Sequence, residues 1–134
     1  AFHGMCTLGH RCFVVGGKKP KGASTEWVLP EEMVAVYDAT RNSWSFPGST
    51  GSPPAPRSSH AVATLGGRVY IHGGAAKVST DGRVTRLGDL LSFKYNGSKM
   101  EWRLEHTLPN AASQEPCGRA AHAMVSLHDR LLIL

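Results

Sequence analysis

Short apolar runs bounded by glycines or polar residues follow one another along the chain. The clearest pair of runs, Ser59–Leu65 and Arg68–His72, is joined by Gly66-Gly67. Two glycines between apolar runs indicate a β-hairpin, because tight hairpin turns require positive φ angles that other residues resist. A second glycine pair, Gly73-Gly74, predicts that the strand ends there in a sharp turn or a close backbone approach.

The hairpin pattern occurs three times. A histidine opens each copy, at His3, His60 and His122, so the copies lie 57 and 62 positions apart. A glycine pair begins 13 positions after each of the first two histidines, at Gly16-Gly17 and at Gly73-Gly74. Self-similarity at this spacing indicates an array of supersecondary units and not one irregular domain.

Two further features repeat with the hairpin. An arginine, Arg57 or Arg119, stands three positions before the second and third histidines. After the first two hairpins come a tyrosine, then Asp or Asn, then a tryptophan six positions on. These residues are Tyr37, Asp38 and Trp44 in the first unit, and Tyr95, Asn96 and Trp102 in the second.

The combination of Arg-x-x-His, a hairpin ending in Gly-Gly, Tyr-Asp and a later tryptophan resembles the kelch repeat. That family builds β-propellers from four-stranded antiparallel blades. The resemblance covers nearly the whole chain and implies an all-β fold, with a first blade over residues 1–46, a second over 57–104 and the opening hairpin of a third over 119–134. Asn96 departs from the usual Asp. The implied structural repeat positions are His3, Gly16, Gly17, Tyr37, Trp44, His60, Gly73, Gly74, Tyr95, Trp102 and His122.

The expected strands alternate in direction and sort the connections between them. The strands are His3–Leu8, Arg11–Val15, Met33–Asp38, Ser43–Phe46, Ser59–Leu65, Arg68–His72, Leu90–Tyr95, Met100–Leu104, Ala121–Leu127 and Arg130–Leu134. Short turns then lie at one end of every sheet. The long connections, Lys18–Glu32, Pro47–Ser58, Ala75–Asp89 and Glu105–Gly118, lie at the other end. Loops longer than about 12 residues in compact domains are usually functional or disordered.

Two and a half units cannot close a propeller, which needs several blades around an axis. Sheet faces and strand edges would stay bare, which is an aggregation hazard. We therefore expect the chain to belong to a longer protein, with the remaining blades of the same chain as its first partners.

Composition narrows the classes of partner. The net charge is +5, but only 19% of residues are charged, which is less than a nucleic-acid interface requires. No apolar run approaches the roughly 18 residues of a membrane span. We therefore expect neither nucleic acid nor membrane as a partner.

The cysteines indicate free thiols. Cys6, Cys12 and Cys117 are odd in number and have no CxxC spacing, which argues against disulfides and zinc. The hairpin register would pair Thr7 with Cys12 and Cys6 with Phe13, so the first two thiols would point to opposite faces. Free thiols are typical of a reducing, cytoplasmic compartment.

No catalytic, cofactor or metal site is expected. The repeated histidines hold equivalent positions in separate blades, which is typical of a structural role and not of a shared ligand set. No nucleophile elbow accompanies them, and Gly16-Gly17 runs into Pro20 where a phosphate loop would open a helix. Some kelch-like propellers carry a galactose-oxidase-like copper site or an isomerase site at the axis. An enzyme of this class stays an alternative, although the sequence shows no convergent Tyr, His and Cys to support it.

The long connections carry the candidate contacts. Trp27 does not repeat, so it is a candidate interface anchor or a residue packing on its own blade. Basic residues make this face positive, which favours an acidic segment as the partner. Arg57 and Arg119 also fit a repeated structural ion pair or carbonyl clamp. The candidate partner-binding residues are Lys18, Lys19, Lys21, Trp27, Arg57, Lys77, Arg83, Arg86 and Arg119.

The resemblance and the loop asymmetry together predict a non-enzymatic protein-interaction module. A rigid repeat scaffold would hold the long connections, and these connections would bind another protein. The alternative is a structural subunit of a large cytoskeletal or multiprotein assembly.

Overall fold

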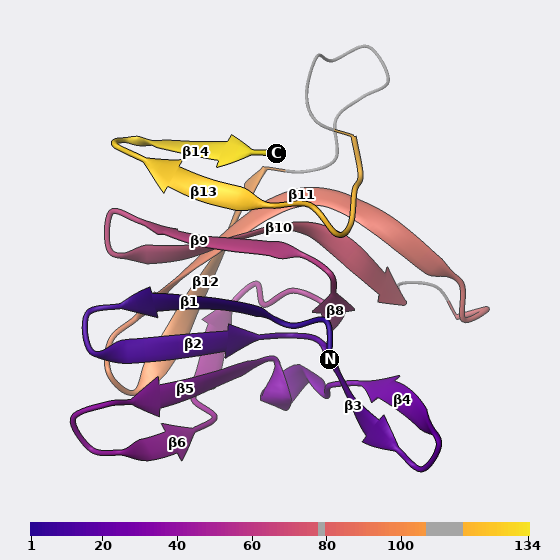
Figure 1. Cartoon of the computed structure of the whole chain (residues 1–134), viewed down its shortest axis with the longest axis horizontal. Coiled ribbons are helices and arrows are strands. Elements are labelled where there is room, and N and C mark those ends of the chain that lie inside the picture. The colour runs from indigo at the N-terminus through magenta and orange to yellow at the C-terminus, as the bar shows by residue number, and fades with distance from the viewer. Residues whose placement is uncertain (78–79, 107–116) are drawn as a thin grey trace.

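The structure is a computed structural model that describes residues 1–77, 80–106 and 117–134. Its strands form a four-stranded sheet, a six-stranded sheet and two separate two-stranded hairpins, one of which is C-terminal (Figure 1). The first sheet contains β1 (Gly4–Leu8), β2 (Arg11–Val15), β5 (Val34–Asp38) and β6 (Ser43–Ser45). The second contains β9 (Ala61–Leu65), β10 (Arg68–Lys77), β11 (Val84–Tyr95) and β12 (Lys99–His106). The C-terminal hairpin contains β13 (Met124–Leu127) and β14 (Arg130–Ile133).

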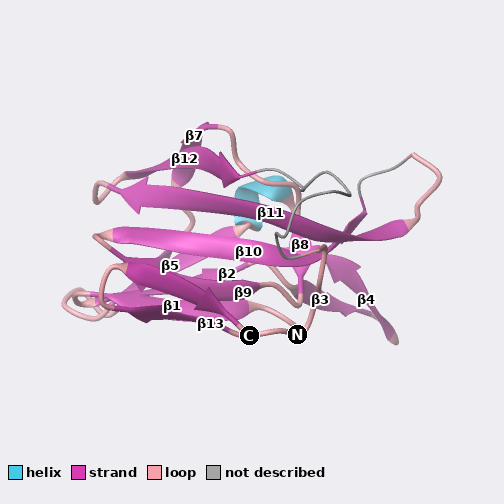
Figure 2. Cartoon of the chain, turned by 90° about the horizontal axis from the view of Figure 1, so that it is seen from above, coloured by secondary structure: helices cyan, strands magenta, loops and turns pink. Residues whose placement is uncertain are grey.

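The predicted all-β class is confirmed, and one short 3-10 helix, η1 (Pro30–Glu32), is added to it. The first sheet, the second sheet and the C-terminal hairpin follow one another in space as they do in the sequence (Figure 1). The tight turns β1–β2, β5–β6, β9–β10 and β13–β14 gather at one end. The β10–β11 and β3–β4 connections extend from the opposite end, in both views (Figures 1 and 2).

Gly73-Gly74 does not end its strand, so this part of the prediction is wrong, whereas β2 does end at Val15, just before Gly16-Gly17. Strand β10 continues through Gly73-Gly74 to Lys77, with a register shift between His72 and Gly74. The two glycines have φ angles of 63° and 93°, which bend the strand as a β-bulge while its pairing with β11 resumes beyond it.

Additional strands form within the predicted loops. The Lys18–Glu32 connection contains the hairpin of β3 (Lys18–Lys21) and β4 (Ser24–Trp27). The Pro47–Ser58 connection contains β7 (Gly48–Gly51), which runs parallel to β12, and β8 (Arg57–Ser58), which pairs with β10. Most of the predicted Glu105–Gly118 connection lies outside the described residues.

A repeated backbone contact joins neighbouring sheets. The N–H of Gly17 donates to the carbonyl of Arg57 at 2.7 Å, and the N–H of Gly74 donates to that of Arg119 at 2.8 Å. A Cβ on Gly16 would overlap the carbonyl oxygen of Arg57. Glycine is therefore required where the backbone of one repeat meets the start of the next.

A second backbone contact repeats one residue before each histidine. The N–H of Ser59 donates to the carbonyl of Phe2 at 2.9 Å, and the N–H of Ala121 donates to that of Ser59 at 2.8 Å. All three residues have φ near +60°, although none is glycine. L-residues rarely adopt this conformation, and here it recurs at the positions that form the inter-sheet hydrogen bonds.

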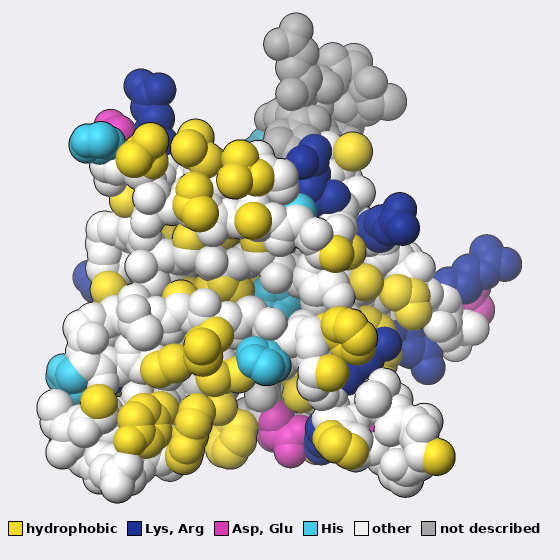
Figure 3. Space-filling view, in the orientation of Figure 1, with side chains coloured by type: hydrophobic (Ala, Val, Ile, Leu, Met, Phe, Trp, Pro, Cys, Tyr) yellow, Lys and Arg dark blue, Asp and Glu magenta, His cyan; other side chains and the backbone are white. Residues whose placement is uncertain are grey.

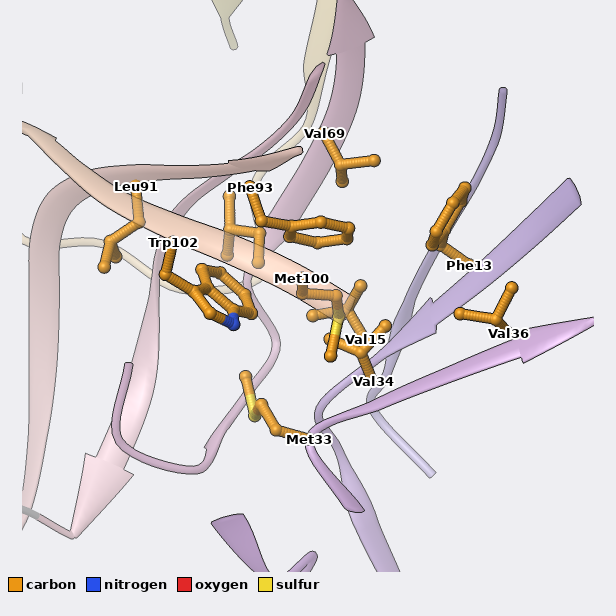
Figure 4. Close-up of a cluster of buried hydrophobic side chains, with 11 residues drawn as sticks. Phe13, Val15, Met33, Val34, Val36, Val69, Leu91, Phe93, Met100 and Trp102 are labelled. Atoms are coloured by element: carbon orange, nitrogen blue, oxygen red, sulfur yellow. The ribbon is translucent and has the colours of Figure 1, made fainter. Parts of the chain in front are cut away.

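The main core lies between the first and second sheets (Figure 4). Phe93 stacks at 5.5 Å from Phe13 and at 4.7 Å from Trp102, measured between ring centroids. The buried members of this cluster are Phe13, Val15, Met33, Val34, Val36, Val69, Ile71, Leu91, Phe93, Met100 and Trp102. Burial of large apolar side chains makes this contact the main source of folding free energy.

The two repeated tryptophans differ in exposure. Trp102 is 4% exposed, and its indole N–H donates to the Ser49 hydroxyl of β7 at 3.1 Å. Trp44 packs on Tyr37 but is 59% exposed, because no described element covers its face of the first sheet. Apolar side chains are accordingly visible over this sheet in the space-filling view (Figure 3).

We predict that Gly16→Ala destabilises the fold more than Gly9→Ala. Both glycines have φ near +60°, so both substitutions carry a backbone cost of about 1–2 kcal/mol. Only Gly16 contacts a neighbouring backbone, whereas nothing lies within 4 Å of the position a Cβ would take on Gly9. The total loss at Gly16 is expected to reach about 3 kcal/mol in urea unfolding. Equal losses at the two positions would contradict the close inter-sheet contact.

Candidate protein-binding face

Several of the connections form one end of the molecule, which we call the long-connection face. It comprises the β3–β4 hairpin, β8 at the end of the Pro47–Ser58 segment and the described part of Ala75–Asp89. The start of the Pro47–Ser58 segment lies elsewhere, because Gly48 of β7 pairs with Lys99 beside the β11–β12 turn. Lys and Arg side chains gather over the right-hand side of Figure 3, where the β10–β11 connection extends. The tight turns occupy the other end.

The lysines of the β3–β4 hairpin are already engaged within the chain. The ammonium of Lys18 lies 4.4 Å from the ring centroid of Trp27, its cross-strand neighbour. Lys19 pairs with Glu32 and Lys21 pairs with Glu26, each at 2.7 Å. This hairpin therefore offers little net positive charge to an acidic partner, and Trp27 has Lys18 on its ring.

The β10–β11 connection retains more of its positive charge. Arg83 pairs with Asp81 at 3.2 Å, and both side chains are exposed. Lys77 and Arg86 are also exposed and form no ion pair within the described residues. These two residues are therefore the strongest of the predicted basic contacts.

Arg57 has a different environment from the other candidates. Its side chain is 2% exposed, and its guanidinium holds both carboxylate oxygens of Asp89, at 2.7 and 2.9 Å. The same side chain also donates to the carbonyl of Gly73 at 3.0 Å. A partner cannot reach this buried fork, so the structural alternative fits Arg57 and it leaves the set of contact candidates. The side chain of Arg119, its counterpart in the repeat, donates to the carbonyl of Cys117 at 3.4 Å and has no carboxylate partner within the described residues.

A cleft of about 490 Å³ lies between the η1 helix and the Pro47–Ser58 segment. The cleft was not predicted from the sequence, although the prolines between Pro47 and Pro56 were a usable signal. Prolines hold such a segment extended and present an apolar surface without side-chain disorder. The residues lining the cleft are Pro30, Glu31, Phe46, Pro47, Gly48, Ser49, Pro53, Pro54, Ala55 and Pro56.

His60 is packed in the contact between the first and second sheets. It is 6% exposed, and neither ring nitrogen has a hydrogen-bond partner among the described residues. Burial, with a smaller effect of the Arg57 charge, lowers the pKa of His60 to about 4. The imidazole is therefore neutral at physiological pH and serves packing.

Metal-binding clusters are absent from residues 1–77, 80–106 and 117–134: no group of three or more His, Cys, Asp or Glu side chains could hold an ion. The predicted hairpin register is confirmed, since Thr7 pairs with Cys12 and Cys6 with Phe13. Burial, followed by the neighbouring Cys12, raises the pKa of Cys6 to about 12. No helix in the described part of the chain has the length and apolar character to cross a membrane.

A protein-family model, described as the KLHDC2/KLHL20/DRC7 Kelch-repeats domain, matches residues 1–134. The chain belongs to the kelch-repeat family. The resemblance predicted from Arg-x-x-His, Gly-Gly, Tyr and Trp is thus confirmed.

Kelch relatives and a solved propeller agree with this assignment. The Rab9 effector protein with kelch motifs from Danio rerio is 36% identical over 67 residues, which are 50% of this chain and 18% of that protein. Kelch domain-containing protein 2 from Bos taurus is 30% identical over 103 residues, which are 77% of this chain and 22% of that protein. The structure of YjhT matches with a TM-score of 0.66 at 14% identity, over 98% of this chain and 33% of that one. The chain thus spans about a fifth of these curated relatives, and the kelch fold is shared with YjhT.

We predict that Arg57→Ala lowers the free energy of unfolding by about 2–4 kcal/mol, because it leaves the Asp89 carboxylate without its partner beside a buried backbone. Arg86→Ala is the matched control. Its side chain is exposed and unpaired within the described residues, so its loss is expected to stay within about 0.5 kcal/mol. Chemical unfolding measures both variants. An unchanged free energy of unfolding in Arg57→Ala would contradict a structural role for Arg57.

Stability is also expected to fall on acidification. Between about pH 6.5 and pH 4 the unfolded chain binds a proton at His60 more readily than the folded chain does. The neutral His60 ring contributes about 3 kcal/mol to the free energy of unfolding. This contribution is fully present above about pH 6.5 and is lost as the pH falls toward 4. Urea unfolding across this range measures it. His60→Gln should reduce the loss, whereas His128→Gln, in an exposed turn, should leave it unchanged. An unchanged loss in His60→Gln, or a reduced loss in His128→Gln, would contradict the claim that burial of His60 causes the acid sensitivity.

Proposed function

We propose that the chain is a non-enzymatic protein-interaction part of a kelch propeller and that it binds another protein through the long-connection face. The observation that carries the proposal is the segregation of connections. Tight turns occupy one end of the sheets, and the β3–β4 hairpin and the β10–β11 extension project from the other (Figures 1 and 2). Variable segments on a rigid scaffold are the usual place for recognition.

The chemistry of this face and of the proline-lined cleft beside it supports two kinds of contact. Lys77 and Arg86 offer positive charge that is unpaired within the described residues, which favours an acidic segment of the partner. The cleft beside Phe46, which is 61% exposed, offers an apolar surface for a side chain of the same partner.

Family membership supports protein binding as the class of function. One relative is named as an effector of Rab9, which is a role exercised through another protein. A cytoplasmic location belongs to the same proposal and is supported by the three free cysteines.

A charge-reversal pair tests the proposed face. Lys77→Glu with Arg86→Glu should abolish capture of protein partners from a lysate and weaken binding of a labelled Glu-rich peptide by at least tenfold. The matched control is Lys94→Glu with Lys99→Glu, which makes the same charge change on exposed residues at the tight-turn end. Quantitative mass spectrometry and fluorescence anisotropy measure the two effects. Equal effects of the two pairs would show that net charge, and not this face, governs binding.

A further inference from the structure

Two histidine rings meet between the second sheet and the C-terminal hairpin. His72 Nδ1 and His122 Nε2 are 2.9 Å apart, and the rings lie edge to face at 88°. His72 belongs to β10 and is 2% exposed, while His122 lies two residues before β13. At this distance one ring donates an N–H to the lone pair of the other, so the two facing nitrogens share a single proton.

The repeat itself does not require this pair. His122 corresponds to His60 in the preceding unit, but His72 corresponds to Val15, 57 positions earlier. The contact between the first and second sheets therefore combines a histidine with a valine that cannot titrate. The contact with the C-terminal hairpin combines two groups that can.

Charged groups on the surrounding elements act on the pair in both directions. Arg119 lies on the segment that leads to His122, and Asp89 on β11 is held by Arg57 of β8 at 2.7 Å. His60, before β9, is a further neutral group nearby. Burial is the main cause that lowers the pKa of both His72 and His122, and Arg119 lowers both further. Asp89 acts in the opposite direction on His72, but Arg57 neutralises it.

Among the described residues, the apolar contact between the C-terminal hairpin and the second sheet is smaller than that between the first and second sheets. Its cluster contains three buried residues, Ala61, Ala63 and Met124, and partly buried apolar side chains pack against them, namely Tyr70, Leu90, Leu131 and Ile133, whereas the other cluster contains eleven buried residues. Backbone bonds from Gly74 to Arg119 and from Ala121 to Ser59 add to the contact. A change at the histidine pair therefore acts within the contact that holds the hairpin.

We propose that His72 and His122 form a pH-sensitive latch that holds the C-terminal hairpin on the second sheet and opens when both rings are protonated. With both rings neutral, or with one proton added, an N–H still lies between the facing nitrogens. When both rings are protonated, each facing nitrogen carries an N–H and a share of positive charge. The hydrogen bond is then lost and the rings repel each other.

Hydrogen exchange of the whole 134-residue chain tests the latch. Between about pH 7.5 and about pH 5, and after correction for intrinsic rates, protection of the β13–β14 amides should fall about tenfold more than that of β1–β2. His72→Val, which installs the residue of the equivalent position, and His72→Gln, which keeps a polar amide but does not titrate, should both remove this selective loss. His128→Gln, on the same hairpin but exposed, should behave as the wild type.

Each outcome decides the proposal. The latch proposal is wrong if β13–β14 lose no more protection than β1–β2 in the wild type. It is also wrong if the two His72 variants keep the selective loss of protection. Should His72→Val fail to fold, His72→Gln alone carries the comparison. NMR titration adds a second readout, because the ring signals of His72 and His122 should shift together in the wild type as a coupled pair.

Discussion

The close backbone approach between neighbouring sheets is the constraint on which the rest of the structure depends. The second glycine of each pair donates its N–H to the carbonyl of the arginine in the next unit. The first glycine leaves no room for a Cβ beside that same carbonyl or beside the next histidine. Because the contact uses backbone atoms, it repeats with the same geometry even though the side chains around it differ.

This contact also determines where variable sequence can be placed. The glycine pair bends the chain at the end opposite the tight turns, and the chain then continues as β3 in the first unit and as the far half of β10 in the second. The extra strands therefore extend from one end of the stacked sheets. The aromatic core between the first and second sheets holds these extensions on a rigid base, which suits a surface for binding another protein.

The elements that could be predicted from the sequence are those with local signals. The Gly9-His10 and Gly66-Gly67 turns and the strand Arg11–Val15 follow from turn residues and apolar patterning, and the structure contains them. Strand β7 could not be predicted, because its sequence Gly-Ser-Thr-Gly has no strand preference and acquires its conformation by pairing with β12.

The candidate site, too, could be predicted from the sequence only in part. That basic residues lie on the long connections could be predicted, but their pairing could not, since it depends on cross-strand register. Lys18 meets Trp27 only because β3 and β4 form a hairpin. Arg57 meets Asp89, 32 positions away, only because β8 and β11 both flank β10.

The most direct test of the account is a hydrogen-exchange footprint of the protein bound to a natural partner. The account predicts that protection on binding appears within the long connections, at residues 18–32, 47–58 and 75–89. It predicts no change at the Gly9-His10 and Gly66-Gly67 turns. Protection centred on those turns, with the long connections unchanged, would contradict the account.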